Sequence, residues 1–451
     1  MIENKKRITK GINFHDLTLN TLLVATILFW WIVSWPINMS PDSLDIWSQI
    51  KNNSYTNSHP VTYTIFVKII SINGTSLSLV SLVQLCLFTF AIYLTSFSLT
   101  SNKKISKFIT TLIILIPTGG SFATTLWKDV PFTSFLLLGF SLLAFNKVKK
   151  NYILAFSFLT IGASFRHNGF FLLLVICLIM LIIKIIYKKL VNPITISIII
   201  LSSIMSIFLL QTVVKVIDAK PIAPWLTWSP MLADLAYVAS RTENTNLNEI
   251  HEIVSTYSKD TSLQLAADCT SVNGLIFSEG FDDTKLISNL PKIQKEYLKF
   301  IYNSPEIFSR LHFCRANSFI PPPFSKGPNY YYWTQLQIIQ PNNFGLQQNS
   351  PIKLIRNIGI VLWDIWNENG NLLLWPGLFA LLSLFCVNQF KSRVVPYWLI
   401  ISWSSLLSLI PWSNAQDFRY AEFSYSIFLI LIFSKLIQLH NRFLKLFFQS
   451  S

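Results

Sequence analysis

Charged and polar side chains recur at the ends of long apolar runs, where a reactive group would border the hydrocarbon of a membrane. An early segment reads Ser40-Pro41-Asp42-Ser43-Leu44-Asp45 and is followed by His59-Pro60. Lys128-Asp129 precedes a later run, and Arg166-His167-Asn168-Gly169 separates two runs. Gln416-Asp417-Phe418-Arg419-Tyr420 precedes the last run. Carboxylates and imidazoles move protons, and lysine and arginine hold phosphate, so these segments predict a site for both tasks.

The candidate residues fall into two chemical classes. A carboxylate can accept a proton from a hydroxyl group or hold a divalent cation. The candidate catalytic residues are Asp42, Asp129, Asp45 and His59. Arginine offers a planar, bidentate fork to a phosphate, and lysine offers a point charge. The candidate residues for binding a donor phosphate are Lys128, Arg166, His167 and Arg419.

Ordinary structural roles compete with these assignments. Asp42 could cap a helix, and Arg166 could extend its charge from the membrane edge to water. His59 could be a turn residue before a proline, and Arg419 could be an exception to the charge distribution of the chain. An acid at the end of a membrane span is costly, however, which favours a functional role for Asp129.

Composition places these segments in a membrane protein. The chain has 451 residues, of which 52% are hydrophobic and only 13% are charged. Soluble domains carry about 25% charged residues, and a soluble fold of this composition would expose large apolar surfaces. Several apolar runs approach the ~20 residues that cross the hydrocarbon core.

We predict an all-α membrane protein of about ten transmembrane helices with a large outer loop domain. The predicted spans are 18–38, 77–99, 108–123, 130–146, 152–165, 169–187, 193–216, 371–388, 394–411 and 422–439. The basic N-terminal segment and first run resemble a secretory signal, but the run is long and no small-residue cleavage site follows it, so we expect a retained span.

The basic residues lie mainly in alternate gaps between these runs. Those gaps hold 18 of the 36 Lys and Arg but only two of the 21 acids, Glu3 and Asp16. An excess of Lys and Arg marks the cytoplasmic side of a polytopic protein. We therefore expect a multi-pass plasma-membrane protein with both termini in the cytoplasm, and the net charge of +15 needs no nucleic-acid partner.

This topology divides the chain into three parts. Residues 1–216 form an N-terminal transmembrane module with the reactive outer loops, 217–370 form an extracytoplasmic loop domain, and 371–451 form the C-terminal transmembrane helices. Leu354–Trp366 is predicted to be an amphipathic helix at the interface. Cys269 and Cys314 are predicted to form a disulfide if the envelope is oxidising. The chain lacks a Walker A motif, a G-x-G-x-x-G and a C-x-x-C, so nothing predicts nucleotide binding or a zinc–cysteine site.

With these motifs the chain resembles membrane glycosyltransferases of the GT-C class, near the dolichyl-phosphate-mannose protein mannosyltransferases and aminoarabinose transferases, and among them poorly characterised bacterial proteins. The resemblance rests on Pro41-Asp42-Ser43 followed by His59-Pro60, and on Trp127-Lys128-Asp129. It also rests on Arg166-His167-Asn168-Gly169 and Phe418-Arg419-Tyr420.

The resemblance implies an enzyme that moves a sugar from a polyprenyl-phosphate carrier, such as undecaprenyl phosphate, to a cell-envelope glycan, lipid or protein on the outer face. The acid of the first loop, Asp42, would be the base or a metal-site residue, and Asp129 the second acid. Arg166 and Arg419 would hold the lipid phosphate. The first loop lacks the adjacent pair of acids, so use of a divalent cation (Mg²⁺ or Mn²⁺) stays open, with Asp42 and Asp129 as its ligands if one binds.

Two other functions fit parts of the sequence. A polysaccharide polymerase or ligase would place its key arginines within 217–370, for example Arg241, Arg310 or Arg315. A lipid-glycan flippase or transporter would carry charges inside its spans and paired broken helices. Here the charges lie at span ends, and no paired half-repeats are visible.

Overall fold

The computed structural model describes most of the chain, and its regular structure is helical. The described residues are 14–145, 149–188, 191–221, 224–239, 269, 283–322, 339–386, 394–411 and 417–449. Within them the β-structure is limited to two isolated bridges, which join Asn38 to Thr125 and Thr56 to Lys220. The chain is thus an all-helical, multi-pass membrane protein, as predicted.

The described residues of the first half of the chain include ten helices. They are α1 (Phe14–Val33), α2 (Pro41–Asn52), α3 (Val61–Ile70), α4 (Leu77–Thr100), α5 (Lys103–Leu115), α6 (Pro117–Ala123), α7 (Asp129–Phe145), α8 (Lys149–Ser164), α9 (Gly169–Ile186) and α10 (Pro193–Val216). The later described helices are α11 (Pro224–Ala239), α15 (Asp283–Ser288), α16 (Leu290–Asn303), α17 (Pro305–Arg315), α18 (Lys353–Glu368), α19 (Gly370–Leu373), α20 (Pro376–Leu384), α21 (Val394–Ser408) and α22 (Glu422–Gln449), with short 3₁₀ turns at Asn317–Phe319 and Phe418–Tyr420.

Fewer helices meet the length and composition of a membrane span than the ten predicted. Among the described residues, α4, α9, α10 and Glu422–Phe443 of α22 do so, and a fifth span results if α5 and α6 are counted as one broken helix. Helices also cover the other predicted spans, but α1, α7 and α21 are shorter apolar helices. The count of ten spans is therefore not confirmed.

The predicted span 108–123 is bent instead of straight. The axes of α5 and α6 differ by 77°. Ile116 is extended, with φ −71° and ψ 144°, because the ring of the following Pro117 disfavours helical backbone at the preceding residue. Gly120 is needed in this bend, since a Cβ there would lie 2.0 Å from the ring of Trp30. A second proline, Pro376, begins α20 and likewise interrupts the predicted span 371–388.

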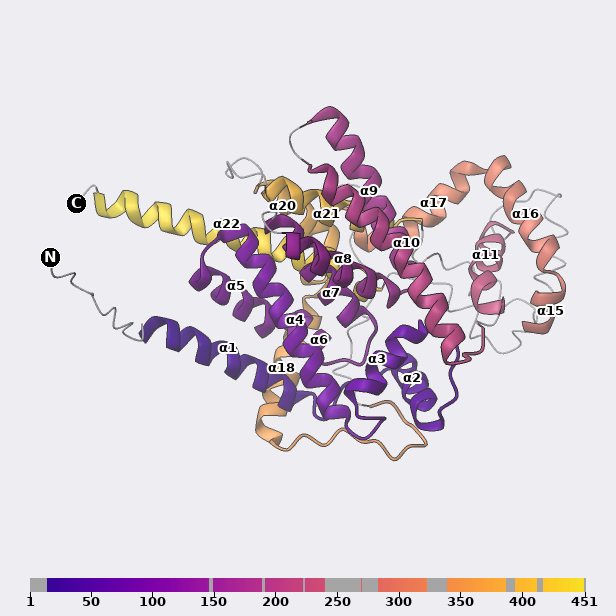
Figure 1. Ribbon diagram of the computed structural model, residues 1–451, viewed down its shortest axis with the longest axis horizontal. Helices are drawn as coiled ribbons and strands as arrows, with labels where there is room; N and C mark the ends of the chain where they lie inside the picture. The colour runs from indigo at the N-terminus through magenta and orange to yellow at the C-terminus, as the bar shows by residue number, and fades with distance from the viewer. Residues whose placement is uncertain are drawn as a thin grey trace.

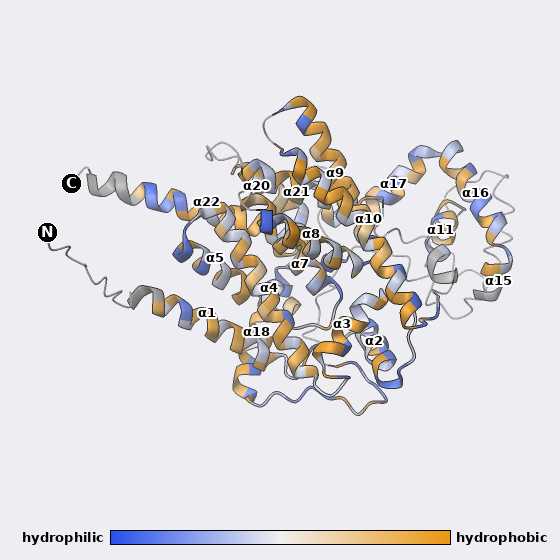
Figure 2. Cartoon of the chain, viewed as in Figure 1, coloured by the Kyte–Doolittle hydropathy of each residue, from blue (hydrophilic) through white to orange (hydrophobic). Residues whose placement is uncertain are grey.

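Figure 1 shows how the helices are arranged. The beginning of α1, the beginning of α5 and the end of α22 lie at one end of the molecule. The helices α11, α15, α16 and α17 form a group at the opposite end. Figure 2 shows apolar residues along α1, α9 and α10, and hydrophilic residues towards the C-terminal end of α22.

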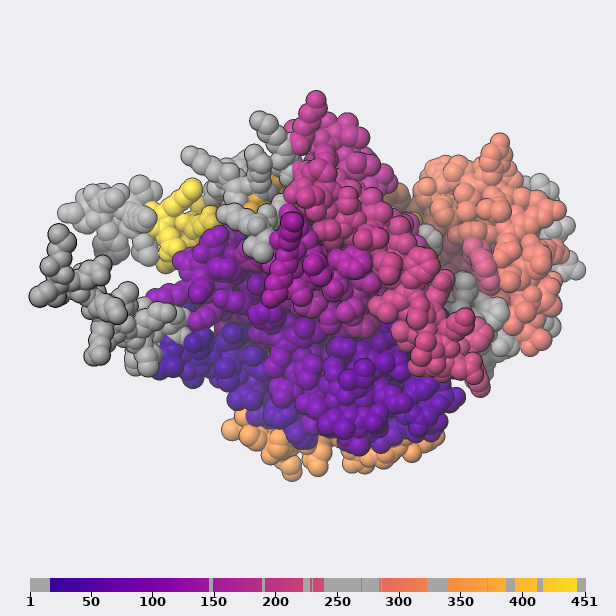
Figure 3. Space-filling view, in the orientation of Figure 1, coloured from indigo at the N-terminus to yellow at the C-terminus, as the bar shows by residue number. Residues whose placement is uncertain are grey.

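The predicted outer region 217–370 falls into two parts in its described residues. One part is the helix group α11, α15, α16 and α17, where Cys269 pairs with Cys314 at a Cα–Cα distance of 5.9 Å, within the normal range for a disulfide. The other part, residues 339–368, packs on α1 through α18, and its surface forms the lower edge of the molecule in Figure 3.

The amphipathic segment predicted at Leu354–Trp366 lies within α18. This helix packs on α1, and Gly359 faces Val33 so closely that an added Cβ would lie 2.5 Å from it. Leu354, Val361 and Ile365 remain exposed on the other side, as an interfacial helix requires.

The helices α2 and α3 were not predicted. The segment 39–76 was expected to be a loop, but α2 and α3 occupy much of it. Pro41 stands in the first turn of α2, where its missing N–H costs nothing, and Asp42 follows near the positive end of the helix. The backbone N–H of Ser40 donates to Ser43 Oγ at 3.1 Å and fixes the start of the helix. The first candidate acid therefore lies on a rigid element.

Candidate functional site

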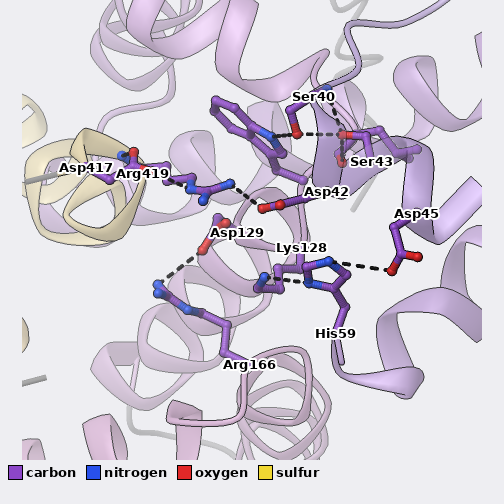
Figure 4. Close-up of polar contacts among 12 residues, drawn as sticks. Ser40, Asp42, Ser43, Asp45, His59, Lys128, Asp129, Arg166, Asp417 and Arg419 are labelled. Atoms are coloured by element: carbon purple, nitrogen blue, oxygen red, sulfur yellow. Dashed lines mark hydrogen bonds and ion pairs between the residues drawn. The ribbon is translucent and has the colours of Figure 1, made fainter. Parts of the chain in front are cut away.

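Charged residues from four distant segments meet beside the start of α2 (Figure 4). Arg419 Nη1 donates to Asp42 Oδ2 at 3.0 Å, across 377 residues of sequence. Arg166 Nη1 lies 3.1 Å from Asp129 Oδ1. Lys128 precedes Asp129 in the sequence and lies close to both pairs in space. The predicted residues Asp42, Lys128, Asp129, Arg166 and Arg419 thus form one cluster, which we call the outer charge cluster.

Hydrogen bonds join the first two segments of this cluster. The backbone N–H of Leu126 donates to the carbonyl of Asn38 at 2.9 Å, as in a β-bridge. Trp127 Nε1 donates to Ser40 Oγ at 2.9 Å, and Ser43 Oγ donates to the carbonyl of Leu126 at 2.8 Å. Because Asp42 follows Ser40 and Lys128 follows Trp127, these bonds hold the two charged segments in register.

A tight turn positions the third segment. Gly169 begins α9 so close to the end of α8 that a Cβ would lie 2.1 Å from the carbonyl oxygen of Ala163. Only glycine fits this approach, and the short connection directs Arg166 into the cluster. Thr62 Oγ1 donates to the carbonyl of Ser164 at 2.5 Å and ties α3 to the same turn.

Arg419 is held between two carboxylates. Its Nε lies 2.7 Å from Asp417 Oδ2, while its Nη1 bonds Asp42. Asp417 also accepts the backbone N–H of Arg419 at 3.2 Å and so caps the 3₁₀ turn. Sequence reasoning missed Asp417, which resembles a solvated loop acid but is 8% exposed.

The electrostatics of these two acids differ. Burial alone would raise the pKa of Asp42, but the charges of Arg419 and Lys128 outweigh it and hold this pKa well below its usual range. Burial raises the pKa of Asp417, and Arg419 offsets this only in part. For Arg419, burial is outweighed by Asp417 and Asp42, which raise its pKa well above the usual value. Asp42 is therefore the more acidic of the two carboxyl groups that face the guanidinium.

The ring of Tyr420 lies between two guanidinium groups. Arg166 Cζ is 5.0 Å from its centroid and Arg419 Cζ is 5.5 Å from it. Arg166 also lies 5.2 Å from the Phe132 ring, and Arg419 lies 5.3 Å from the Trp127 ring. The faces of aromatic rings attract cations. These three rings therefore hold the guanidinium groups of Arg166 and Arg419 on either side of Tyr420. Tyr420 was not among the predicted site residues, although it follows Arg419 directly.

Asp129 is the most deeply buried acid of the cluster. It is 1% exposed, and Arg166 is 8% exposed. The two carboxylate oxygens of Asp129 accept no hydrogen bond of good geometry within the described part of the chain, so charge alone holds the pair at 3.1 Å. These oxygens keep lone pairs that a ligand hydroxyl could use.

His59 joins the cluster through Lys128. Lys128 Nζ lies 3.2 Å from His59 Nδ1, which suits an ammonium donating to a neutral imidazole. Burial and then the Lys128 charge lower the pKa of His59 to about 3, so the ring is neutral. Its contact with Asp45, at 3.8 Å, is therefore polar and not ionic. Asp45 is 49% exposed and instead accepts a hydrogen bond from Gln49 at 2.8 Å, which places it at the edge of the site.

A cavity of about 390 Å³ opens beside Arg166 and His167. Asn57 and Gln211 add further polar groups to this end. The rest of its wall is mainly apolar, with Phe170 of α9 and Ile207, Leu210 and Val214 of α10, and it also includes Ser164 and Ser206. His167, which is exposed, borders this cavity and not the Asp42 side of the cluster. One cationic end and one apolar wall suit an amphipathic ligand.

The side chains do not fit a divalent cation in this arrangement. Asp42 and Asp129, the predicted ligands, each face a guanidinium group. Among the described residues, no three His, Cys, Asp or Glu side chains are grouped as a metal site. Ca²⁺ and Mg²⁺ need several oxygen ligands, and arginine occupies the space that such an ion would take between Asp42 and Asp417.

Comparison with known proteins finds one similar structure and no similar sequence. No protein-family model matches the sequence, and no curated protein matches it. The structure is similar to the crystal structure of the Archaeoglobus fulgidus oligosaccharyltransferase in complex with Zn and sulfate, with a TM-score of 0.44 and 14% identity. The alignment covers 93% of this chain and 50% of that one, so this chain spans about half the length of that protein.

Proposed function

We propose that this protein is a membrane glycosyltransferase that takes a sugar from a polyprenyl-phosphate carrier and transfers it to a hydroxyl of a cell-envelope acceptor. The observation that carries the proposal is the cavity beside Arg166, whose cationic end adjoins the outer charge cluster and whose wall is apolar. A lipid phosphate would place its charge near Arg166 and its chain along α9 and α10, towards the hydrocarbon.

The transfer needs one proton acceptor and stabilisation of one leaving phosphate. The acceptor oxygen attacks the anomeric carbon, the bond from that carbon to the phosphate oxygen breaks, and the polyprenyl phosphate leaves. The hydroxyl proton passes to Asp42. Arg166 and Arg419 neutralise the charge that develops on the phosphate, which is a task for fixed cations in a site sheltered from water.

We infer that Arg419 couples the two substrates. While it bonds Asp42 at 3.0 Å, this carboxylate is a weak base because its pKa is held low. A donor phosphate between Arg166 and Arg419 would compete for the guanidinium. Loss of that ion pair would raise the pKa of Asp42 and make it a better proton acceptor once the donor is bound. Asp417 would keep Arg419 in place during this exchange.

The arginines that a polymerase or ligase would use do not converge in the described residues. Arg310 forms an exposed pair with Glu306, and Arg315 is buried against Asp234. Arg241 lies outside the described residues. Arg310 therefore serves as a matched control, because it is a paired arginine distant from the cluster in sequence.

Donor binding is the direct test. Purified protein is titrated with polyprenyl monophosphate and with the corresponding polyprenol, and the two affinities are compared. We expect the phosphate to bind at least tenfold more tightly, since a charge-assisted hydrogen bond contributes about 1.5–3 kcal/mol. Arg166→Ala should remove most of this difference, Arg166→Lys should keep part of it, and Arg310→Ala should keep all of it. Equal binding of phosphate and alcohol would overturn the proposal.

A further inference from the structure

A second cavity, of about 640 Å³, lies between α1, α5 and α22. Its walls are apolar and include Leu19, Phe108, Leu112, Phe433, Leu436 and Ile437. At one end the lining becomes polar, with Lys104, His440 and Asn441. No acid lines it. We call it the terminal groove, because it lies at the end of the molecule where α1 begins and α22 ends.

The surroundings of the polar end are cationic. Lys103 and Lys107 flank Lys104 along α5, and Arg442 follows Asn441 on α22. The only acids that the sequence places in the gaps between spans on this side are Glu3 and Asp16, whose side chains lie outside the described ones. An anion at the mouth of the groove would therefore meet several positive charges and no acid of the groove lining.

We propose that the terminal groove binds one anionic phospholipid from the leaflet at this end, with an acyl chain along the apolar walls and the headgroup phosphate at Lys104 and His440. The apolar walls of the groove suit the acyl chain of the lipid. The basic end suits its headgroup, because basic pockets between membrane helices bind anionic headgroups. The volume lies within the range of small-molecule sites, roughly 300–1,000 Å³. The site is separate from the outer charge cluster and does not depend on the proposed reaction.

The position of the groove gives the lipid a role. Its walls come from α5 and α22, which also contact each other directly. At their other ends, α5 leads through the bend at Pro117 towards Lys128, and α22 begins just after Arg419 and Tyr420. A lipid bound between α5 and α22 would contact both of the helices that lead to Lys128 and Arg419. Binding of this lipid should therefore stabilise the folded protein.

The test compares lipids of equal chain length. Detergent-solubilised full-length protein is titrated with phosphatidylglycerol or phosphatidylcholine, and native mass spectrometry counts the retained lipids while thermal unfolding is followed. We expect one tightly held phosphatidylglycerol that raises the unfolding temperature more than phosphatidylcholine does. Soluble glycerol phosphate should not compete, since it lacks the chain that the apolar walls bind.

Three variants locate the site. Lys104→Ala combined with His440→Ala should weaken phosphatidylglycerol binding about tenfold or more, through loss of a charged hydrogen bond. Leu436→Trp should weaken binding of both lipids by filling the groove. Lys150→Ala, at an exposed lysine that does not line the groove, is the control and should bind as the wild type does. All four residues are exposed, so the variants should fold. Equal retention of both lipids, or equal losses in Lys150→Ala and the double variant, would overturn the proposal.

Discussion

Two buried acid–arginine clusters can be compared in this molecule. In the helix group of α11, α15, α16 and α17, Asp234 accepts a hydrogen bond from Arg315 at 2.8 Å and one from Tyr297 at 3.0 Å, and His312 lies 3.6 Å away. In the outer charge cluster, Arg419 bonds Asp42 in a similar way. Both clusters bury paired charges, but their surroundings differ.

The Asp234 cluster is self-contained. Its members come from three helices that pack around one small core, next to the disulfide of Cys314. The outer charge cluster instead joins segments from both halves of the chain and adjoins a cavity. A buried ion pair alone is thus weak evidence of function, because it can simply fix the packing of helices. The convergence of several cations beside a cavity is the more informative feature.

The largest effect is expected at Asp42. Asp42→Asn keeps the shape of the side chain but removes the base, and general-base assistance contributes about 10²–10⁴-fold in rate. Transfer activity should fall by that factor while the protein still accumulates in the membrane. Asp364→Asn, at an exposed acid of α18, is the control. Activity of Asp42→Asn within threefold of the wild type would instead favour Asp129 as the base.

The matched change in the other cluster should affect stability and not binding. Asp234→Asn leaves Arg315 buried without its charge partner, which costs about 3–5 kcal/mol in other proteins. Proteolysis within residues 224–322 should become faster, and polyprenyl phosphate should bind with unchanged affinity. A large loss of donor affinity without faster proteolysis would mean that the Asp234 cluster is a binding site as well.

A smaller effect is expected at Asp417, which we regard as a positioning residue. Asp417→Asn removes the charge that faces Arg419 Nε at 2.7 Å and should lower turnover about tenfold, which corresponds to about 1.4 kcal/mol of transition-state stabilisation. Asp417→Glu should restore part of it. The apparent pKa of the rate profile should also shift, since Arg419 sets the pKa of Asp42. An unchanged pH profile would reduce Asp417 to a purely structural capping residue.

The contribution of His59 to folding stability should depend on pH only under acidic conditions. Its pKa of about 3 in the folded protein lies below the usual 6.5, so the stability contributed by the neutral ring is fully present above pH ~6.5 and declines as pH falls towards 3. Unfolding of the wild type should therefore become easier between pH 6 and 4 more steeply than that of His59→Gln. A rate step near pH 6.5 that His59→Gln abolishes would show that the ring titrates normally.

No effect is expected from chelation. Since guanidinium groups face Asp42 and Asp129, transfer should persist after treatment with EDTA, and added Mg²⁺ or Mn²⁺ should not raise it. Loss of transfer on chelation, with recovery on addition of one metal, would require Arg419 to leave Asp42 for a cation.

The sequence predicted which residues lie together better than it predicted how they pair. The alternation of basic and mixed gaps was enough to place Asp42, Lys128, Asp129 and Arg166 on one side of the membrane. It did not predict that Arg419 faces Asp42, because this choice depends on the packing of α22 against the first half of the chain. The buried state of Asp417 is likewise set by tertiary contacts that no local pattern records.

The helices likewise divide into those that local sequence predicted and those that it did not. Long apolar runs such as α9 and α10 were predicted almost to the residue, because their hydrophobicity alone defines them. The helix α2 was missed, since its mixture of polar and apolar residues has no long run. The bend at Pro117 had a visible signal in Pro117-Thr118-Gly119-Gly120, which the length of the apolar run outweighed.

The span of 377 residues between Asp42 and Arg419 has a consequence for synthesis of the protein. A ribosome delivers Asp42, Asp129 and Arg166 long before Arg419, so the buried pair of Asp129 and Arg166 can form in a nascent chain that ends at α10. Asp42 cannot pair with Arg419 until the segment that leads into α22 has been synthesised. The ion pair that completes the outer charge cluster therefore closes last, and a chain arrested earlier during translation would hold every acid of the early segments but only part of the positive charge.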